Sequence, residues 1–237
     1  MLAGTMVFDP MWFLFAAPGL LLGLWAQMRV KTTFSKYSDV RPANGMNGAQ
    51  AAAAVLQTAG LPSLSIEPIE GHLTDHYDPR AKTLRLSQDV GQASSLAALG
   101  VAAHEAGHAI QDAKGYAPMR FRQAIVGPVM FAQGFWIFPA MGGLLLGGAQ
   151  TPLGSWLMLA GIALFGIVVL FQLVTLPVEF DASRRALAAL EQQGLLSSAE
   201  VPAAREVLTA AAWTYVAGFV SALGQLLYFV MAFNRSR

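Results

Sequence analysis

The sequence predicts an α-helical membrane protein with about four transmembrane helices and a small α+β domain. Three observations lead to this prediction. Hydrophobic residues make up 55% of the 237 residues and charged residues only 12%, which is about half the charged share of a soluble domain. The charges are unevenly distributed, so that long stretches of the chain carry none. The stretches that do carry charge contain short helical and strand patterns, which indicate a folded domain outside the membrane.

The uncharged stretches predict where the chain crosses the membrane. A helix that spans the hydrocarbon core needs about 20 apolar residues. We expect four spans, at about residues 11–28, 124–148, 154–176 and 211–233. Residues 123–178 form one uncharged run that is too long for a single crossing, and the turn-type residues 147–152 divide it. The first span has no basic leader and no small-residue cleavage site, so we interpret it as a retained anchor rather than a signal peptide.

Local patterns in the polar stretch after the first span predict two helices and two strands. Residues 49–59 form a helical pattern that ends at a glycine and a proline. Residues 64–67 and 83–87 alternate between apolar and polar side chains, which is typical of strands. A longer helix is expected over residues 94–113, where serines at the start can cap it.

The helix over residues 94–113 carries the motif His104-Glu105-Ala106-Gly107-His108. Residues four apart project from one helix face, so the two imidazoles can hold a single metal ion. Zinc suits two imidazoles and a carboxylate, with a fourth position open for water. Glu105 lies where its carboxylate can reach that water and act as a general base. The chain has no cysteine, which excludes thiolate ligands, and we expect one Zn²⁺ per chain.

A third protein ligand must lie on the same side of the membrane as the motif. The chain returns to that side after the third span, where Pro177 is expected to open a helix. Glu179 and Asp181 follow at once, and since residues two apart on a helix point in different directions, only one is expected to bind the metal. A carboxylate without a partner at the membrane boundary is costly, which favours Glu179. The predicted metal ligands are His104, His108 and Glu179.

These motifs resemble those of the YugP-type neutral zinc metallopeptidases, which are bacterial membrane proteins. The resemblance lies in residues 72–80, 104–108 and 176–186, and it extends over nearly the whole chain. More distantly, the chain is similar to membrane peptidases of the HtpX and CAAX-prenyl-protease type. Those proteins place a strand before the H-E-x-x-H helix and take a glutamate ligand from a later helix. The resemblance implies a zincin-like domain and a zinc-dependent metalloendopeptidase of gluzincin type, with Glu105 as general base.

The chain departs from that wider group at one position. There the ligand glutamate opens an E-x-x-x-D pattern, whose aspartate orients a ligand histidine. Matching Glu179 to the glutamate places Ser183 where the aspartate would stand, so we expect another group to orient the histidine. Asp112, on the same helix face as His108, and Asp181 are the two candidates.

Other polar residues are candidates for contact with a substrate. The oxyanion formed during peptide hydrolysis needs a donor besides the metal, and His76, Tyr77 and Tyr116 are possible donors. His72 and His76 are four residues apart, but in an extended or looped stretch, so a structural loop is favoured over a second metal site or a substrate contact. An exposed strand edge between residues 64 and 88 is expected to hold an extended peptide.

The topology follows from the distribution of basic residues. Four spans place both polar blocks on one side, where lysine and arginine residues cluster near the membrane, although Arg235 and Arg237 oppose this bias. The positive-inside rule predicts a multi-pass protein of the inner (plasma) membrane with its active site on the cytoplasmic side. The expected division is an N-terminal anchor (1–28), a cytosolic zincin-like part (29–123), two transmembrane helices (124–176), a helical segment with the third ligand (177–210) and a C-terminal transmembrane helix (211–237).

Two alternative interpretations keep the same fold. An intramembrane protease of the site-2 type would need the motif inside an apolar span, but Asp89 and Lys114 flank it. A catalytically inactive or regulatory membrane scaffold would not need Glu105. A net charge of +1 without a basic cluster argues against a nucleic-acid partner. The expected partners are the lipid bilayer and a peptide or protein substrate, with membrane proteins among the substrates considered.

Overall fold

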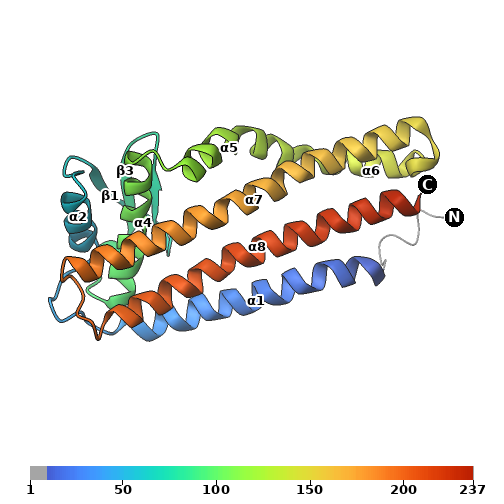
Figure 1. Ribbon diagram of the computed structural model, residues 1–237. Helices are drawn as coiled ribbons and strands as arrows, with labels where there is room; N and C mark the ends of the chain where they lie inside the picture. The colour runs from blue at the N-terminus through green and yellow to red at the C-terminus, as the bar shows by residue number, and fades with distance from the viewer. Residues whose placement is uncertain (1–9, 237) are drawn as a thin grey trace. The chain divides into compact units, whose positions relative to one another are not determined.

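The structure is a computed structural model that describes residues 10–236 (Figure 1). Its helices and strands are α1 (Pro10–Ser38), α2 (Gly48–Thr58), β1 (Ser65–Ile69), β2 (His76–Asp78), β3 (Thr83–Ser87), α3 (Gln88–Gly91), α4 (Leu96–Ala113), α5 (Ala117–Phe135), α6 (Ile137–Leu145), the short 3₁₀ helix η2 (Gly148–Gln150), α7 (Pro152–Gln192) and α8 (Val201–Arg235). The predicted helical membrane protein with a small α+β part is confirmed.

The chain divides into two compact units, which we call the apolar unit and the α+β unit. The apolar unit contains the described residues up to Trp25, Phe121–Leu176 and the described residues from Tyr215 onward. The α+β unit contains Ala26–Arg120 and Pro177–Thr214. The long helices α1, α7 and α8 each contribute residues to both units.

Four helical stretches are long and apolar enough to cross a membrane: Pro10–Ser38, Ala117–Leu145, Pro152–Gln192 and Val201–Arg235. Within the apolar unit they pack through small residues and rings. A Cβ on Gly161 would lie 2.7 Å from the Ala140 nitrogen, and the Trp136 and Phe165 rings are 4.5 Å apart. Most of the exposed large hydrophobic side chains also belong to this unit. An apolar exterior of this extent is typical of helices that face lipid.

Two helices are longer than the sequence predicts. The basic stretch that follows the first span does not leave the helix, because α1 continues to Ser38. Pro177 does not open a helix either; it lies inside α7, which is continuous from Pro152 to Gln192. A proline removes one backbone donor and usually breaks a helix, but long membrane helices tolerate it, as they also do at Pro18 in α1 and Pro128 in α5.

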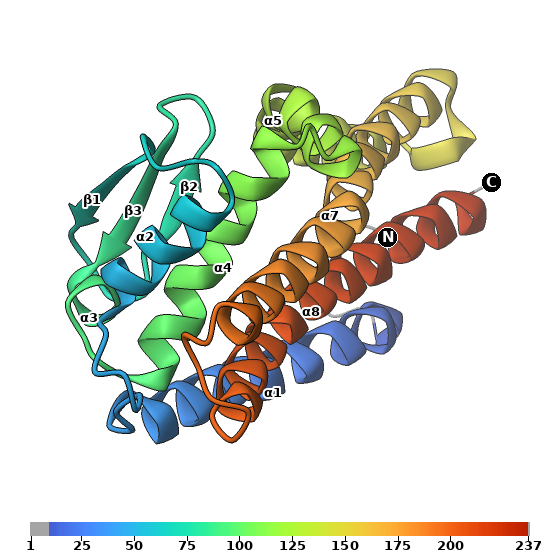
Figure 2. The ribbon, with the colours of Figure 1, turned by 60° about the vertical axis from the view of Figure 1, so that its left-hand side comes forward.

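The α+β unit contains a three-stranded sheet in the order β1-β3-β2. β1 runs parallel to β3, with Ile66 opposite Leu84. β2 runs antiparallel to β3, with Tyr77 opposite Leu84. Figure 2 shows the strands beside α2 and α4. β2 was expected only as an extended or looped stretch, and as an edge strand of three residues it gives too short a pattern to identify from the sequence.

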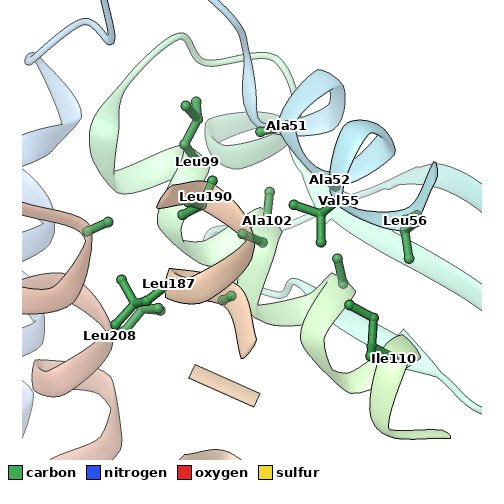
Figure 3. Packing of buried hydrophobic residues seen from close by; sticks show 14 of the residues in the cluster. Ala51, Ala52, Val55, Leu56, Leu99, Ala102, Ile110, Leu187, Leu190 and Leu208 are labelled. Atoms are coloured by element: carbon green, nitrogen blue, oxygen red, sulfur yellow. The ribbon is translucent and has the colours of Figure 1, made fainter. Parts of the chain in front are cut away.

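The hydrophobic core of the α+β unit joins helices from distant parts of the sequence. Val55 of α2, Leu99 and Ala102 of α4, Leu190 of α7 and Leu208 of α8 are all buried in one cluster (Figure 3). α4 begins at Leu96, two residues after the predicted start, and the Ser95 side chain caps it by accepting a hydrogen bond from the Ala98 backbone N–H at 3.1 Å. This core therefore holds α4 against α7, and the two helices carry the predicted site.

Candidate metal centre

α4 presents the two histidines of the motif from one face. The rings of His104 and His108 lie 4.7 Å apart between centroids and are nearly perpendicular, at 83°. The Ala-rich surface of α4 around them is packed against the core, so that His108 is only 8% exposed. Two imidazoles thus meet in a place that is largely closed to water.

α7 places Glu179 against both histidines. Its Oε2 lies 3.2 Å from Nε2 of His104 and 3.5 Å from Nε2 of His108. One ligand atom from each residue lies within 4.8 Å of the other two, and Glu179 is 2% exposed. Two imidazole nitrogens and a carboxylate oxygen converging on one point form a donor set that suits zinc. The structure therefore brings together the three residues that the sequence suggested as ligands.

The close approach of α4 and α7 depends on a small residue within the motif. A Cβ on Gly107 would lie 2.6 Å from the Ala182 carbonyl oxygen, which is closer than real contacts allow. Ala182, on the facing side of α7, is itself fully buried. The glycine therefore allows the backbones to come near enough for Glu179 to reach the histidines.

Glu105 lies on α4 next to the edge strand β2. Its Oε2 accepts a hydrogen bond of 3.0 Å from the Tyr77 backbone N–H. Burial raises the pKa of the Glu105 carboxyl, an effect opposed by the nearby imidazoles of His104 and His108. The Tyr77 hydroxyl donates to Asp112 at 2.7 Å. Two hydrogen bonds from Tyr77, one from its backbone and one from its side chain, therefore join β2 to α4.

The outer nitrogens of both histidines have side-chain partners. His108 Nδ1 lies 3.0 Å from Oε1 of Gln111, and His104 Nδ1 lies 3.1 Å from Oγ of Ser183. Ser183, which stands where the wider group has an aspartate, thus contacts His104 itself. The sequence had led us to expect that a residue other than Ser183 orients the histidine. Asp112, one of the two candidates, instead accepts from Tyr77 and Lys82.

Asp181, the other candidate, reaches His108 only through Gln111. The Gln111 Nε2 donates to Oδ2 of Asp181 at 2.9 Å. Sequence reasoning missed Gln111, although it lies three residues after His108 and is a polar residue in a helix of small apolar ones. That spacing places it beside the histidine on the helix surface.

The candidate oxyanion donors lie in different surroundings. The Tyr77 hydroxyl is bound to Asp112, and burial together with this bond raises its pKa. His76 Nδ1 lies 2.9 Å from the Thr74 carbonyl oxygen, whereas the Tyr116 ring lies under the Arg185 guanidinium, 5.7 Å from its centroid. The bond to Asp112 occupies the Tyr77 hydroxyl proton, whereas Nε2 of His76 and the Tyr116 hydroxyl remain candidates.

His72 and His76 do not act as a pair in the structure. His72 Nδ1 lies 2.5 Å from Asp89 Oδ2, while His76 bonds to the backbone of its own segment. Among residues 10–236, neither belongs to a group of three or more metal-ligating side chains. His72 lies in the connection between β1 and β2, whereas His76 is the first residue of the strand β2 and not part of a loop.

Four apolar helices and a His-His-Glu cluster on two packed helices define a class, the membrane-bound metallopeptidases. A family model described as "Putative neutral zinc metallopeptidase" matches residues 12–234, and the chain belongs to this family. It is similar to the "Putative membrane protease YugP" of Bacillus subtilis (strain 168), with 43% identity over 216 residues, covering 91% of this chain and 93% of the relative. No solved structure matches the chain. The resemblance stated from the motifs is thereby confirmed.

Proposed function

We propose that the protein is a zinc-dependent endopeptidase of gluzincin type, in which His104, His108 and Glu179 hold one Zn²⁺. The observation that carries the proposal is the convergence of their ligand atoms within 4.8 Å. A carboxylate that is 2% exposed is costly to bury unless a cation or strong donors compensate it. Zinc is also the metal named in the description of the family.

Glu105 serves as the general base in this proposal. Zinc, when bound, supplies Lewis acidity that polarises the scissile carbonyl and makes water nucleophilic near neutral pH. Glu105 takes a proton from the water while the water oxygen attacks the carbonyl carbon. Glu105 then delivers that proton to the amine nitrogen as the C–N bond breaks. The Tyr77 N–H holds Oε2 of Glu105, which leaves Oε1 to carry the proton.

The substrate in this proposal is a peptide segment in extended form. β2 pairs with β3 on one side only, and its Tyr77 contacts Glu105 beside the metal centre. An extended peptide can add to such an edge through backbone hydrogen bonds. This would present a peptide bond directly to Glu105 and the metal.

The membrane location suggests where the reaction takes place. Basic residues of the α+β unit, including Arg29, Lys31 and Arg184, lie in the helices that continue into the apolar spans. By the positive-inside rule these residues favour a cytoplasmic α+β unit. We therefore place the active site at the cytoplasmic face of the inner (plasma) membrane, and membrane proteins are accessible substrates there.

Metal analysis of the detergent-purified protein tests the proposal. The wild type should carry about one zinc per chain, and Glu179→Ala should lose it. Glu191→Ala, an exposed position on the same helix, is the matched control and should keep it. Zinc retained by Glu179→Ala would move the third ligand elsewhere, with Asp181 next to test. A wild type that takes up no added zinc would contradict the peptidase and favour the membrane scaffold.

A further inference from the structure

Gln111 is a wholly buried polar residue whose amide contacts three separate groups. It is 0% exposed. Its Oε1 lies 3.0 Å from His108 Nδ1, and its Nε2 donates to the Val178 carbonyl at 2.8 Å and to Asp181 Oδ2 at 2.9 Å. A buried amide that uses both ends in this way has a single favourable orientation.

That orientation determines which nitrogen of His108 carries the proton. The Val178 carbonyl and the Asp181 carboxylate can only accept, so the Gln111 NH₂ must face them and its oxygen must face His108. An oxygen acceptor requires a proton on Nδ1 of His108. Neutral His108 then keeps the lone pair of Nε2 available to a metal ion, on the side where Glu179 Oε2 lies 3.5 Å away. By contrast, the Ser183 hydroxyl beside His104 can donate or accept, and so it does not select a tautomer.

The same amide also locates the third ligand. Val178 and Asp181, its two acceptors, lie on either side of Glu179 along α7. Asp181 is held in turn by Arg184 and by Arg185, whose Nε is 2.5 Å from Oδ2. The amide therefore connects His108 on α4 with the segment of α7 that carries Glu179.

We infer that Gln111 is a positioning residue that fixes the His108 tautomer and the placement of Glu179 together. This inference rests on the proposed metal site. Partners that orient a ligand histidine typically contribute 10–100-fold to metal affinity. Gln111 contacts one ligand histidine directly and also binds the residues on either side of Glu179, so we expect its loss to weaken metal binding by about 10–100-fold.

The test uses the full-length protein in detergent with two variants and a control. Gln111→Met keeps the length of the side chain but makes no hydrogen bonds, and Gln111→Glu keeps an acceptor for His108 but removes the donors to α7. Gln57→Met, at an exposed position of α2, is the control. Metal affinity is measured by Co²⁺ titration with visible absorption spectra. The tautomer of His108 is measured in metal-free protein at alkaline pH, where the imidazole is neutral, by ¹⁵N NMR of labelled histidine rings.

We expect Gln111→Met to weaken Co²⁺ binding by about 10–100-fold and to lose the preference for the Nδ1–H tautomer. Gln111→Glu should keep that tautomer but bind Co²⁺ more weakly. The double variant with Asp181→Asn exchanges donor and acceptor between the two side chains, so it should recover part of the Co²⁺ affinity. The control should match the wild type. Wild-type affinity and tautomer in both Gln111 variants would overturn the inference.

The two measurements separate this inference from the proposed function. A wild type that binds no Co²⁺ would overturn the metal site and the contribution of Gln111 to metal affinity. The ¹⁵N spectrum of the metal-free protein would still decide the tautomer. If Gln111→Met does not fold, the Gln111→Glu variant and its double variant with Asp181→Asn provide the same comparison, and unchanged Co²⁺ binding in both would overturn the inference.

Discussion

Different kinds of internal contact stabilise the apolar unit and the α+β unit. In the apolar unit, helices meet at small residues, as where a Cβ on Gly224 would lie 2.3 Å from the Phe15 carbonyl oxygen. In the α+β unit, buried polar side chains are paired across elements, as in the contacts from His108 through Gln111 to Asp181. Of the exposed large hydrophobic side chains among the described residues, all but Met28, Val40, Phe180 and Trp213 belong to the apolar unit.

This difference follows from the solvent that each unit faces. Lipid provides no hydrophobic driving force between helices, so small residues that allow close backbone contact hold membrane helices together. In water, burial of apolar side chains drives folding, and any polar group that is buried must be paired. α7 belongs to both units, and its sequence changes accordingly. It carries no charge up to Leu176, whereas Glu179, Asp181 and Arg184 follow within eight residues.

The largest effect is expected from the α+β unit, at Glu105. Glu105→Gln should lower kcat for peptide hydrolysis by about 10²–10⁴-fold, because the amide cannot accept the proton of the attacking water. Zinc content should stay at the wild-type level, since Glu105 is not among the proposed ligands. Peptide cleavage assays and metal analysis on the same preparation check both statements. Glu191→Gln is the control, and an active Glu105→Gln variant would refute the assigned base.

In the apolar unit, a charge on an outward-facing position should prevent stable insertion. Leu21, near the middle of the first span, is 66% exposed, and an aspartate in the middle of a span costs about 2.5–3.5 kcal/mol of insertion free energy. Leu21→Asp should therefore lower the fraction of protein that resists extraction from membranes by alkaline carbonate. Gln57→Asp, in the α+β unit, should not change this fraction. Equal extraction of the two variants would contradict the assignment of α1 to the membrane.

Two glycines in the two units sharpen the comparison further. Gly107→Ala places a methyl group 2.6 Å from the Ala182 carbonyl oxygen, and overpacking of this kind costs about 1–3 kcal/mol. The helices α4 and α7 must move apart, so the zinc affinity should fall together with the melting temperature. A Cβ on Gly166, in the apolar half of α7, meets nothing within 4 Å. Gly166→Ala should therefore leave the zinc affinity unchanged and leave the melting temperature unchanged or slightly raised. Zinc titration with thermal unfolding in detergent measures both variants.

The smallest effect is expected at the surface of the α+β unit, where Asp78 holds the turn between β2 and β3. Its carboxylate accepts from the Arg80 and Ala81 N–H groups and from Arg85. These bonds lower the Asp78 pKa to about 2. A lowered pKa contributes stability that is complete above about pH 4 and is lost as the pH falls toward 2.

Asp78→Asn should therefore lower the melting temperature slightly at pH 7, and the difference from the wild type should shrink at pH 3. Thermal unfolding at the two pH values measures this change. Asp39→Asn, at an exposed position after α1, is the control. A difference that does not depend on pH would show that the Asp78 carboxylate is not the cause.

Local patterns were sufficient where a feature depends on neighbouring residues. The apolar spans and α4 with its histidine pair follow from composition and helical spacing, although helices such as α1 and α7 continue well beyond the expected spans. β2 escaped prediction because a three-residue strand is defined by its partner β3 rather than by its own pattern. Pro177 suggested a helix start, whereas α7 continues through it from Pro152 to Gln192.

The sequence by itself determined the membrane character of the protein, its family motif and the choice of Glu179 as a candidate third ligand, because these depend on residue types, short spacings and the order of the apolar spans along the chain. Only the tertiary structure decided how the site is supported. Ser183 contacts His104, and Gln111 reaches Asp181, because Gly107 lets α4 and α7 approach closely. Hydrogen bonds between residues far apart in the chain depend on distance and direction in space, and no spacing along the sequence contains that information.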